Sequence, residues 1–216
     1  MLERIICLLI GYVCGNFLTG YIIGKTKDVD IRTVGSGNVG TTNTYRNLGP
    51  TAGALTLVGD ILKVVVAILL AWALFHKSGP EMVKLLQYYA GVGAVLGQNF
   101  PVVMKLKGGK GIACTGGMVL ALCPICAPIS IALMLLAIFT THYMSLASIL
   151  GLISLFAQVV IFGQNGMLGV SDAYLPEVYV LMGVLAALGI LRHQSNIKRL
   201  LAGNENKFYF KSKKEV

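Results

Sequence analysis

The chain has 216 residues, of which 56% are hydrophobic and only 12% are charged, and it carries a formal net charge of +9. Because soluble domains carry about 25% charged residues, this composition excludes an ordinary soluble domain. It predicts an all-α polytopic membrane protein, in which lipid surrounds the apolar segments. No linker, low-complexity tract or clear repeat divides the sequence, so we expect a single membrane domain over residues 1–216.

Six apolar runs follow one another along the chain and predict membrane crossings. They cover residues 5–24, 52–75, 83–100, 112–140, 146–162 and 174–191. Most have the roughly 17–25 residues that a helix needs to cross a bilayer. The first run lacks a small-x-small cleavage site and leads directly into a polar segment, so we interpret it as a permanent span and not as a cleaved signal peptide.

The fourth run is longer than one crossing requires and contains Pro124 and Pro128 near its middle. Proline removes a helical hydrogen bond and clashes with the preceding turn. We therefore expect two short spans, about 115–123 and 127–140, that meet near the outer face. This division gives seven transmembrane helices. The first half is short enough to begin or end inside the membrane, which is tolerated where protein or water lines the break.

Basic residues gather after the first, third and last runs. They are Lys25, Lys27, Arg32, Arg46, Lys105, Lys107, Lys110, Arg192, Lys198, Arg199, Lys207, Lys211, Lys213 and Lys214. Cytoplasmic segments carry an excess of Lys and Arg, so we place segments 25–50, 101–115 and 192–216 in the cytoplasm and the N-terminus outside the cell. Seven crossings satisfy this arrangement, whereas six do not. The simpler alternative is that these residues only set topology or contact anionic lipids, which suffices for Lys211, Lys213 and Lys214.

The first cytoplasmic segment holds a polar motif over residues 35–49. Its glycines, Gly35 and Gly37 among them, let backbone N–H groups approach an anion closely. Arg46 offers a planar fork that suits phosphate. Neutral donors are supplied by Ser36, Asn38, Thr42 and Asn43. A solvated loop is the alternative, but the density of donors beside an arginine favours an anion site.

The second cytoplasmic segment contains Gly108, Gly109, Lys110 and Gly111, which resemble half of a P-loop. The full spacing and the preceding strand of a nucleotide site are missing, so ATP hydrolysis is not predicted. N–H groups at a helix start nevertheless favour a phosphate. Lys110 would supply a point charge, and Thr115 would cap the helix or bond an oxygen. By itself, this short motif is equally compatible with a plain loop.

The third cytoplasmic segment begins after the last run. If that helix continues, His193 and Asn196 share one face at i, i+3 spacing, and the helix ends before Gly203. Glu205 is the only acid between Glu177 and Glu215, and we expect it to pair with nearby basic groups. A lone histidine is more often packed or capped, but this one shares the cationic side with Asn196.

Two further features lie inside the runs. Asp60 and Lys63, at i, i+3 spacing in the second run, are expected to form a buried pair near the cytoplasmic end. Cys123 and Cys126 form a C-x-x-C pattern without the βαβ surroundings of a redox motif, so we interpret them as apolar packing residues. No disulfide framework is apparent among the five cysteines.

Taken in order, the three cytoplasmic motifs resemble those of the bacterial acyl-phosphate:glycerol-3-phosphate acyltransferases, the PlsY family, and the resemblance covers nearly the whole chain. It implies seven spans in a multi-pass protein of the bacterial inner membrane, with the active site at the cytoplasmic face. It also implies that an acyl group moves from acyl phosphate to the 1-hydroxyl of glycerol 3-phosphate. The products are lysophosphatidic acid and phosphate, in phospholipid synthesis.

The resemblance further implies roles for individual residues. The expected catalytic residues are Ser36, Arg46, Lys110, His193 and Asn196. The expected substrate-binding residues are Gly35, Gly37, Asn38, Thr42, Asn43, Gly108, Gly109, Gly111, Thr115 and Glu205, and Glu205 also maintains the structure. Acyl phosphate is the donor, so neither acyl-CoA nor a metal or other cofactor is implied. The expected partners are the two substrates and membrane lipids, without nucleic acid, and we expect a monomer.

Two positions depart from the family pattern. Gln98 stands where the family usually has histidine, although glutamine keeps one hydrogen bond. His142 stands where a cationic residue is common, and it would serve either as a substitute donor or as a helix-end cap. The proton acceptor also stays open. His193 is one candidate, and the phosphate of the acyl donor, which the resemblance favours, is the other.

Two other classes of function compete with the enzyme. A transporter or channel for an anionic solute would also use broken helices, but it needs a polar path across the bilayer, and here the polar residues concentrate on one face. A peptidoglycan- or lipid-binding structural protein is the third class. Phosphate release that requires both acyl phosphate and glycerol 3-phosphate would identify the enzyme.

Overall fold

The computed structural model describes residues 1–209, so the predicted lipid contacts of Lys211, Lys213 and Lys214 lie outside the described residues. Within residues 1–209 the chain forms helices and no strand. In chain order these are α1 (Leu2–Gly15), α2 (Thr19–Lys25), α3 (Thr41–Leu48), α4 (Pro50–Phe75), η1 (His76–Ser78), α5 (Pro80–Asn99), η2 (Val102–Met104), α6 (Ile112–Leu122), η3 (Pro124–Cys126), α7 (Ala127–Thr141), α8 (Met144–Gln164), α9 (Leu175–Leu191) and α10 (Gln194–Leu201).

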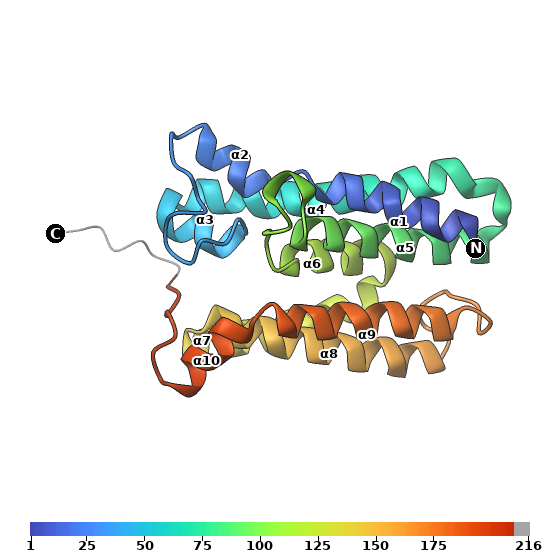
Figure 1. Ribbon diagram of the computed structural model, residues 1–216. Coiled ribbons are helices and arrows are strands. Elements are labelled where there is room, and N and C mark those ends of the chain that lie inside the picture. Colours follow the sequence, from blue (N-terminus) through green and yellow to red (C-terminus); the bar gives the residue numbers. More distant parts are fainter. Residues whose placement is uncertain (210–216) are drawn as a thin grey trace.

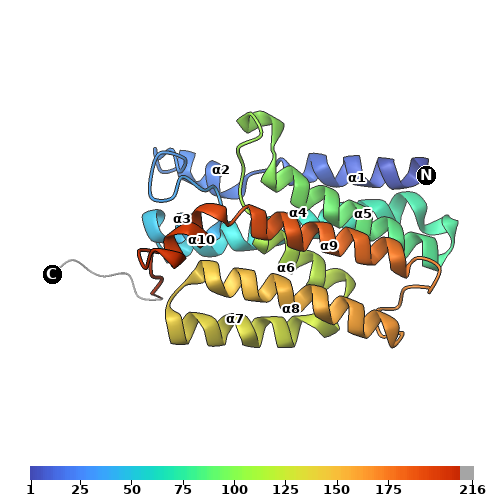
Figure 2. The ribbon, with the colours of Figure 1, turned by 60° about the horizontal axis from the view of Figure 1, so that its bottom comes forward.

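The long helices run side by side in two groups, as Figures 1 and 2 show. The helices α1, α4, α5 and α6 form one group, and α7, α8 and α9 form the other. The helix α9 packs against both α5 and α8 and so joins the two groups. The chain passes from the first group to the second between α6 and α7, where the sequence places its prolines.

Glycines set the contact between α1 and α5. A Cβ atom added at Gly11 would lie 1.9 Å from the Ala90 carbonyl oxygen. At Gly15, Gly93 and Gly97 it would lie 2.1–2.2 Å from a carbonyl oxygen of the facing helix. Small residues four positions apart let membrane helices approach to backbone contact, so these glycines fix α1 against α5.

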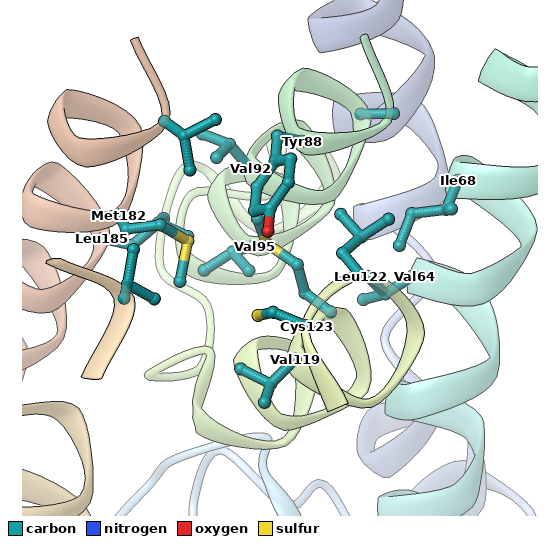
Figure 3. Close-up of a cluster of buried hydrophobic side chains, with 14 of the residues drawn as sticks. Val64, Ile68, Tyr88, Val92, Val95, Val119, Leu122, Cys123, Met182 and Leu185 are labelled. Carbon is teal, nitrogen blue, oxygen red and sulfur yellow. The ribbon is translucent and has the colours of Figure 1, made fainter. Parts of the chain in front are cut away.

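The helix α5 lies at the centre of the largest hydrophobic cluster. Side chains of α4, α5, α6 and α9 point toward one another in Figure 3, with Tyr88 of α5 among them. Cys123 and Cys126 are free thiols buried in the same cluster. This placement agrees with their interpretation as packing residues.

Four segments among the described residues are long and apolar enough to cross a membrane. They are Leu2–Lys25, Pro50–Ser78, Pro124–Thr141 and Met144–Gln164. A fifth is counted if α9 and α10, which are bent by 53° at the break between them, form one span. The helix α6 is apolar but shorter, and α5, expected to cross as residues 83–100, is not among these segments. Seven crossings and the orientation of the termini therefore stay predictions.

The fourth run breaks where its prolines predict a break. The helix α6 ends at Leu122, the short turn η3 follows, and α7 begins at Ala127. Lys84 of α5 donates a hydrogen bond of 2.8 Å to the carbonyl oxygen of Leu122. This bond satisfies one of the carbonyl groups that a helix end leaves without a partner, which is the compensation that a broken helix inside a membrane needs.

The helices α3 and α10 lie at the same end of the molecule (Figure 1). The last helix does not continue straight through His193, as the i, i+3 expectation assumed. Instead α9 ends at Leu191, and α10 begins at Gln194 after a bend of 53°. The bend turns α10 toward the other polar segments.

Candidate active site

Two adjoining cavities lie where the three polar segments meet. One, of about 490 Å³, extends between α4, α6, α7 and α8 and has mainly apolar walls, including Leu57, Val119, Met134 and Leu155. The other, of about 450 Å³, is bounded mainly by polar and glycine residues of the three polar segments. Six residues line both cavities: Ser36, Asn38, Lys110, Asn196, Arg199 and Asn206. An apolar chamber thus joins a polar chamber across a shared polar border.

The loop of residues 35–37 is held by Asn43 of α3. The Nδ2 group of Asn43 donates to the carbonyl oxygens of Ile31 and Val34, each at 3.1 Å, and its Oδ1 accepts from the Ser36 backbone N–H at 2.9 Å. Gly35 has φ +58°, and a Cβ atom there would lie 2.4 Å from Asn43 Oδ1. Asn43 therefore shapes the loop that presents Ser36, and it would have to release these bonds to serve as the substrate donor we expected.

The remaining polar groups of the first motif face the cavities. The hydroxyl of Ser36 makes no hydrogen bond within residues 1–209, and this residue is exposed. Asn38 uses its Oδ1 to accept from the Gly40 backbone N–H at 3.0 Å, while Thr42 lines the apolar cavity. Arg46 Nη2 donates to the carbonyl oxygens of Asn206 at 3.0 Å and Lys207 at 3.2 Å. The C-terminal segment thus fixes one nitrogen of the guanidinium.

The glycine loop before α6 differs from our expectation. The backbone N–H of Gly108 donates to the Asn99 carbonyl oxygen at 3.2 Å, and that of Gly109 donates to the Gln98 carbonyl oxygen at 2.8 Å. The expectation that these two N–H groups are offered to an anion is therefore wrong for this structure, because they bond the last carbonyl groups of α5. Gly111 has φ +75° and forms the N-cap of α6. The donors that this loop can still offer to an anion therefore lie at Lys110 and after it.

Arg192 clamps the same loop from the other side and was not among the predicted site residues. It donates to the Gly108 carbonyl oxygen at 2.9 Å and to the Gly109 carbonyl oxygen at 3.0 and 3.2 Å. Its guanidinium lies 5.3 Å from the centre of the Phe100 ring. It also lines the polar cavity. From the sequence alone, Arg192 was recognisable only as one more basic residue after the last apolar run.

A chain of polar contacts joins the second motif to the third. Lys110 Nζ donates to Asn196 Oδ1, and Asn196 Nδ2 donates to Glu205 Oε1 at 2.6 Å. Glu205 also accepts from Ser145 at 3.0 Å and from Arg199 at 2.7 Å. Burial raises the pKa of Glu205, but hydrogen bonds from Asn196, Arg199 and Ser145 outweigh it and leave the pKa below its usual value. The carboxylate is thus ionised and engaged, as its expected structural role requires.

Lys110 is the charged group at the centre of the shared border. Burial lowers the pKa of its ammonium to about 8, with Arg199, Arg192 and Arg46 adding to the decrease and Glu205 opposing it. One of the three N–H groups of Lys110 donates to Asn196. Its other N–H groups have no partner within residues 1–209, so they are available to an anion in the cavity.

His193 is buried at the start of α10 and lines the apolar cavity. Its Nδ1 lies 2.7 Å from the Gly189 carbonyl oxygen. Burial, followed by the positive charge of Lys110, lowers the pKa of the imidazole to about 4. The ring is therefore neutral near pH 7. Its proton lies on Nδ1, where it can bond the carbonyl, and Nε2 is left as a hydrogen-bond acceptor.

The expected pair of Asp60 and Lys63 forms, and it is part of a larger buried network. Lys63 Nζ donates to Asp60 Oδ1 at 2.8 Å, to the Phe17 carbonyl oxygen at 2.9 Å and to Gln98 Oε1. Gln98 Nε2 donates to Asp60 Oδ2 at 3.3 Å. All three ammonium hydrogens are engaged, so Lys63 supports the helices under the glycine loop and has no donor left for a substrate.

The structure brings the predicted residues together around the two cavities, with one exception. Every predicted site residue except Gly109 lines at least one cavity. Their roles in binding and catalysis stay predictions. Sequence reasoning missed Arg192, Ser195, Arg199 and Asn206, which line the polar cavity as well.

His142 lies apart from the cavity walls. It ends α7 with φ +60°, and its ring centre is 4.8 Å from that of Tyr209. It does not belong to the lining of either cavity. Of its two alternatives, the helix-end role is the one that this geometry favours.

The fold and the site together define a class of protein. It is an all-helical protein with membrane-spanning segments and, at one end, a cationic polar cavity that opens into an apolar one. Within this class the chain belongs to the glycerol-3-phosphate acyltransferase family, whose model matches residues 5–203.

Relatives and solved structures agree with this assignment. A glycerol-3-phosphate acyltransferase of Trichlorobacter lovleyi is 36% identical over 91% of this chain and 93% of its own length. One of Clostridioides difficile is 37% identical over 95% of both. The crystal structure of PlsY, an integral membrane glycerol 3-phosphate acyltransferase, is similar in its glycerol 3-phosphate form, with a TM-score of 0.80 and 35% identity over 95% of this chain and 96% of that one. Its lysophosphatidic acid form has a TM-score of 0.78 at 34% identity, over 95% of both chains.

Proposed function

We propose that this chain transfers a fatty acyl group from acyl phosphate to the 1-hydroxyl of glycerol 3-phosphate. The products are lysophosphatidic acid and inorganic phosphate, and the reaction serves phospholipid synthesis. The observation that carries the proposal is the junction of an apolar and a cationic cavity at Ser36, Lys110 and Asn196. An acyl phosphate has an apolar chain and an anionic head, and its reactive carbonyl lies at the junction between them.

The polar cavity suits the phosphate groups of both substrates. Lys110, Arg192 and Arg199 line it, and Arg46 stands beside it in the apolar cavity wall. Charge-assisted hydrogen bonds from such groups to phosphate are stronger than bonds between neutral partners. The proposal is supported by two crystal structures of a similar protein, one described as its glycerol 3-phosphate form and the other as its lysophosphatidic acid form.

Acyl transfer also needs a proton acceptor and stabilisation of the carbonyl oxygen. We infer that the substrate hydroxyl is the nucleophile and that the phosphate of the acyl donor takes its proton as it leaves. The low pKa of His193, about 4, makes its ring a weak base, whereas the departing phosphate gains negative charge and basicity as its bond to the acyl carbon breaks. His193 Nε2 would then orient the hydroxyl as an acceptor, and Ser36 would donate to the carbonyl oxygen or orient a substrate.

The setting that we propose is the bacterial inner membrane. Seven crossings would place the N-terminus outside and the basic segments, with the active site, at the cytoplasmic face. We propose a monomer that contacts membrane lipids and works without a metal or other cofactor. Within residues 1–209, no group of three or more His, Cys, Asp or Glu side chains is arranged to hold a metal ion.

An assay of the purified protein with both substrates tests this function. Inorganic phosphate and lysophosphatidic acid are expected only when acyl phosphate and glycerol 3-phosphate are both present, with or without a chelator. Acyl-CoA in place of acyl phosphate is expected to give no product. Glycerol 3-phosphate that crosses sealed vesicles without acylation would instead support a carrier, and product formed from acyl-CoA would contradict the proposed donor.

A further inference from the structure

The residues after α10 run back between the first motif and the turn that joins α7 to α8. We name residues 204–209 the C-terminal strap. Gly203, with φ +68°, reverses the chain just before it. The family model matches residues 5–203, so the strap follows the matched region. Its course along the site raises the question of what it does there.

Phe208 anchors the strap in an apolar pocket. Its side chain is only 5% exposed and packs with Ala137, Ile138 and Ala147 of α7 and α8. Its backbone N–H donates to the His142 carbonyl oxygen at 2.7 Å. A terminal segment usually stays poorly ordered unless it is tied down, and this one is tied down by a buried aromatic ring and a backbone hydrogen bond.

The same anchor reaches the first motif. The Phe208 ring centre lies 5.1 Å from that of Tyr45 and 5.8 Å from the Arg46 guanidinium carbon. The carbonyl oxygens of Asn206 and Lys207, just before Phe208, accept both hydrogen bonds of Arg46 Nη2. The strap therefore contacts the guanidinium through two carbonyl groups and one ring face.

These contacts restrict the long side chain of Arg46, which lines the apolar cavity together with Ser36 and Lys110. An arginine alone can take many rotamers, and a guanidinium binds an oxyanion best when its fork is already oriented. With Nη2 held by the strap, Nε and Nη1 have no partner within residues 1–209. They remain available to an anionic substrate.

We propose that the C-terminal strap, anchored by Phe208, is a positioning element that orients Arg46 toward the phosphate of a substrate. The inference rests on the proposed function, in which Arg46 contacts phosphate. Phe208 does not touch the reacting atoms, and its effect passes through Arg46. The strap also carries Glu205, so it links the cationic groups of the first and third motifs.

A double-mutant cycle between Phe208 and Arg46 tests the proposal. Phe208→Ala is expected to lower kcat/KM by about tenfold, since misplacing a binding group by about 1 Å costs up to about 100-fold. The decrease is expected mainly as a raised KM for a phosphate-bearing substrate. Lysine at position 46 presents a single ammonium and does not need the planar orientation that the strap imposes on arginine. In the Arg46→Lys background, Phe208→Ala is therefore expected to change kcat/KM by less than about twofold, because the effects of residues that share one interaction are not additive.

Controls separate positioning from folding. Phe17→Ala makes the same chemical change between α1 and α2, at a residue that is 56% exposed, and is expected to leave the kinetics unchanged. Phe208→Leu keeps an apolar anchor but lacks the aromatic face. If Phe208→Ala does not fold, Phe208→Leu replaces it in the double-mutant cycle. Truncation after Tyr209 keeps the whole strap and should keep activity, whereas truncation after Lys207 removes the anchor and should reproduce Phe208→Ala.

The outcomes are distinguishable. Equal loss from the Phe208 variant in the wild-type and Arg46→Lys backgrounds would show that the strap does not act through Arg46 and would overturn the proposal. Unchanged kinetics in Phe208→Ala and in the shorter truncation would overturn it as well. Wild-type kinetics in Arg46→Lys and Arg46→Ala would instead contradict the role of Arg46 in the proposed function. Absence of acyl transfer in the unaltered protein would contradict the proposed function itself.

Discussion

The loops at residues 35–37 and 108–111 are both rich in glycine, and both border the polar cavity. In the first loop, the Asn43 side chain holds the backbone and leaves the Ser36 hydroxyl exposed to the cavities. In the second loop, the N–H groups of Gly108 and Gly109 donate to carbonyl oxygens of α5, and Arg192 donates to the carbonyl oxygens of the same two glycines. The glycines of the second loop thus allow the loop to pack closely against α5 and Arg192. In this loop, only Lys110 remains to contact an anion.

The largest effect is expected from removing the ammonium group under the second loop. Lys63→Met would leave the buried Asp60 and Gln98 without their central donor, and breaking a buried pair by removing one partner costs about 3–5 kcal/mol. We expect a large fall in the thermal unfolding midpoint in detergent. Asp60→Asn combined with Lys63→Met removes both charges and should recover part of the loss. A single variant as stable as the wild type would show that the network does not support the loop.

Lys110→Ala is expected to have the largest effect on substrate binding. A hydrogen bond to a charged group contributes about 1.5–3 kcal/mol, so the KM for glycerol 3-phosphate should rise by about 10- to 100-fold. Lys110→Arg keeps a cation and should lose less. Steady-state kinetics at saturating acyl phosphate measures the change. A KM equal to that of the wild type would show that the side chain does not bind this substrate, and the second loop would then contribute only packing.

Exchanging glycine for alanine compares the two loops directly. At Gly108 an added Cβ would lie 2.2 Å from the Gln98 carbonyl oxygen and 2.4 Å from the Pro101 ring, neither of which can easily move. We expect a destabilisation of about 3 kcal/mol, at the upper end of overpacking effects. At Gly35 the nearest atoms belong to side chains, and the left-handed backbone should cost about 1–2 kcal/mol.

Gly116 provides the control for these substitutions. It lies within α6 with no atom close to an added Cβ, so Gly116→Ala should leave the unfolding midpoint unchanged or raise it slightly, since alanine is favoured over glycine by about 1 kcal/mol in helices. If Gly35→Ala proved more damaging than Gly108→Ala, the view that tight packing distinguishes the second loop would be wrong.

Much of the fold was predictable because its signals are local. Apolar run lengths, Pro124 and Pro128 indicated the helices and the break between α6 and α7, and the i, i+3 spacing indicated the Asp60–Lys63 pair. The bend after Leu191 was not predicted, because no proline lies between α9 and α10, and because α10 contacts distant positions, as in the hydrogen bond from Lys110 to Asn196.

The residues that line the site were largely predictable from the sequence. The hydrogen bonds between them were not. Residue types and the family resemblance selected groups that do line the cavities. Which amides remain available depended on contacts between distant positions, such as Gln98 with Gly109 and Arg192 with Gly108. The strap was missed for the same reason, because neither Phe208 nor Arg46 carries any local signal of the contact between them.

The smallest effect is expected from pH, and it depends on the same Lys110 side chain. Its pKa of about 8 means that raising the pH from 7 to 9 converts most of the ammonium to a neutral amine, which weakens phosphate binding. Glycerol 3-phosphate is already largely dianionic in this range, since its second pKa is about 6. The KM for glycerol 3-phosphate should therefore rise by up to about tenfold at pH 9, because one pH unit above the pKa leaves about a tenth of the charged form.

The Lys110→Arg variant sharpens this pH test. A guanidinium stays protonated throughout the range, so the KM of the variant should stay nearly flat between pH 7 and 9. In the wild type, kcat at saturating glycerol 3-phosphate should change less than the KM, because a bound dianion holds the proton on Lys110 and raises its pKa. A wild-type KM that is as flat as that of an active arginine variant would show that the ammonium does not titrate here. The Lys110→Ala variant then decides between two explanations, because an ammonium that stays protonated throughout this range still binds an anion. Only if that variant also keeps the wild-type KM would Ser36 and Arg46 of the first motif, with the third motif, form the anion-binding side of the cavity.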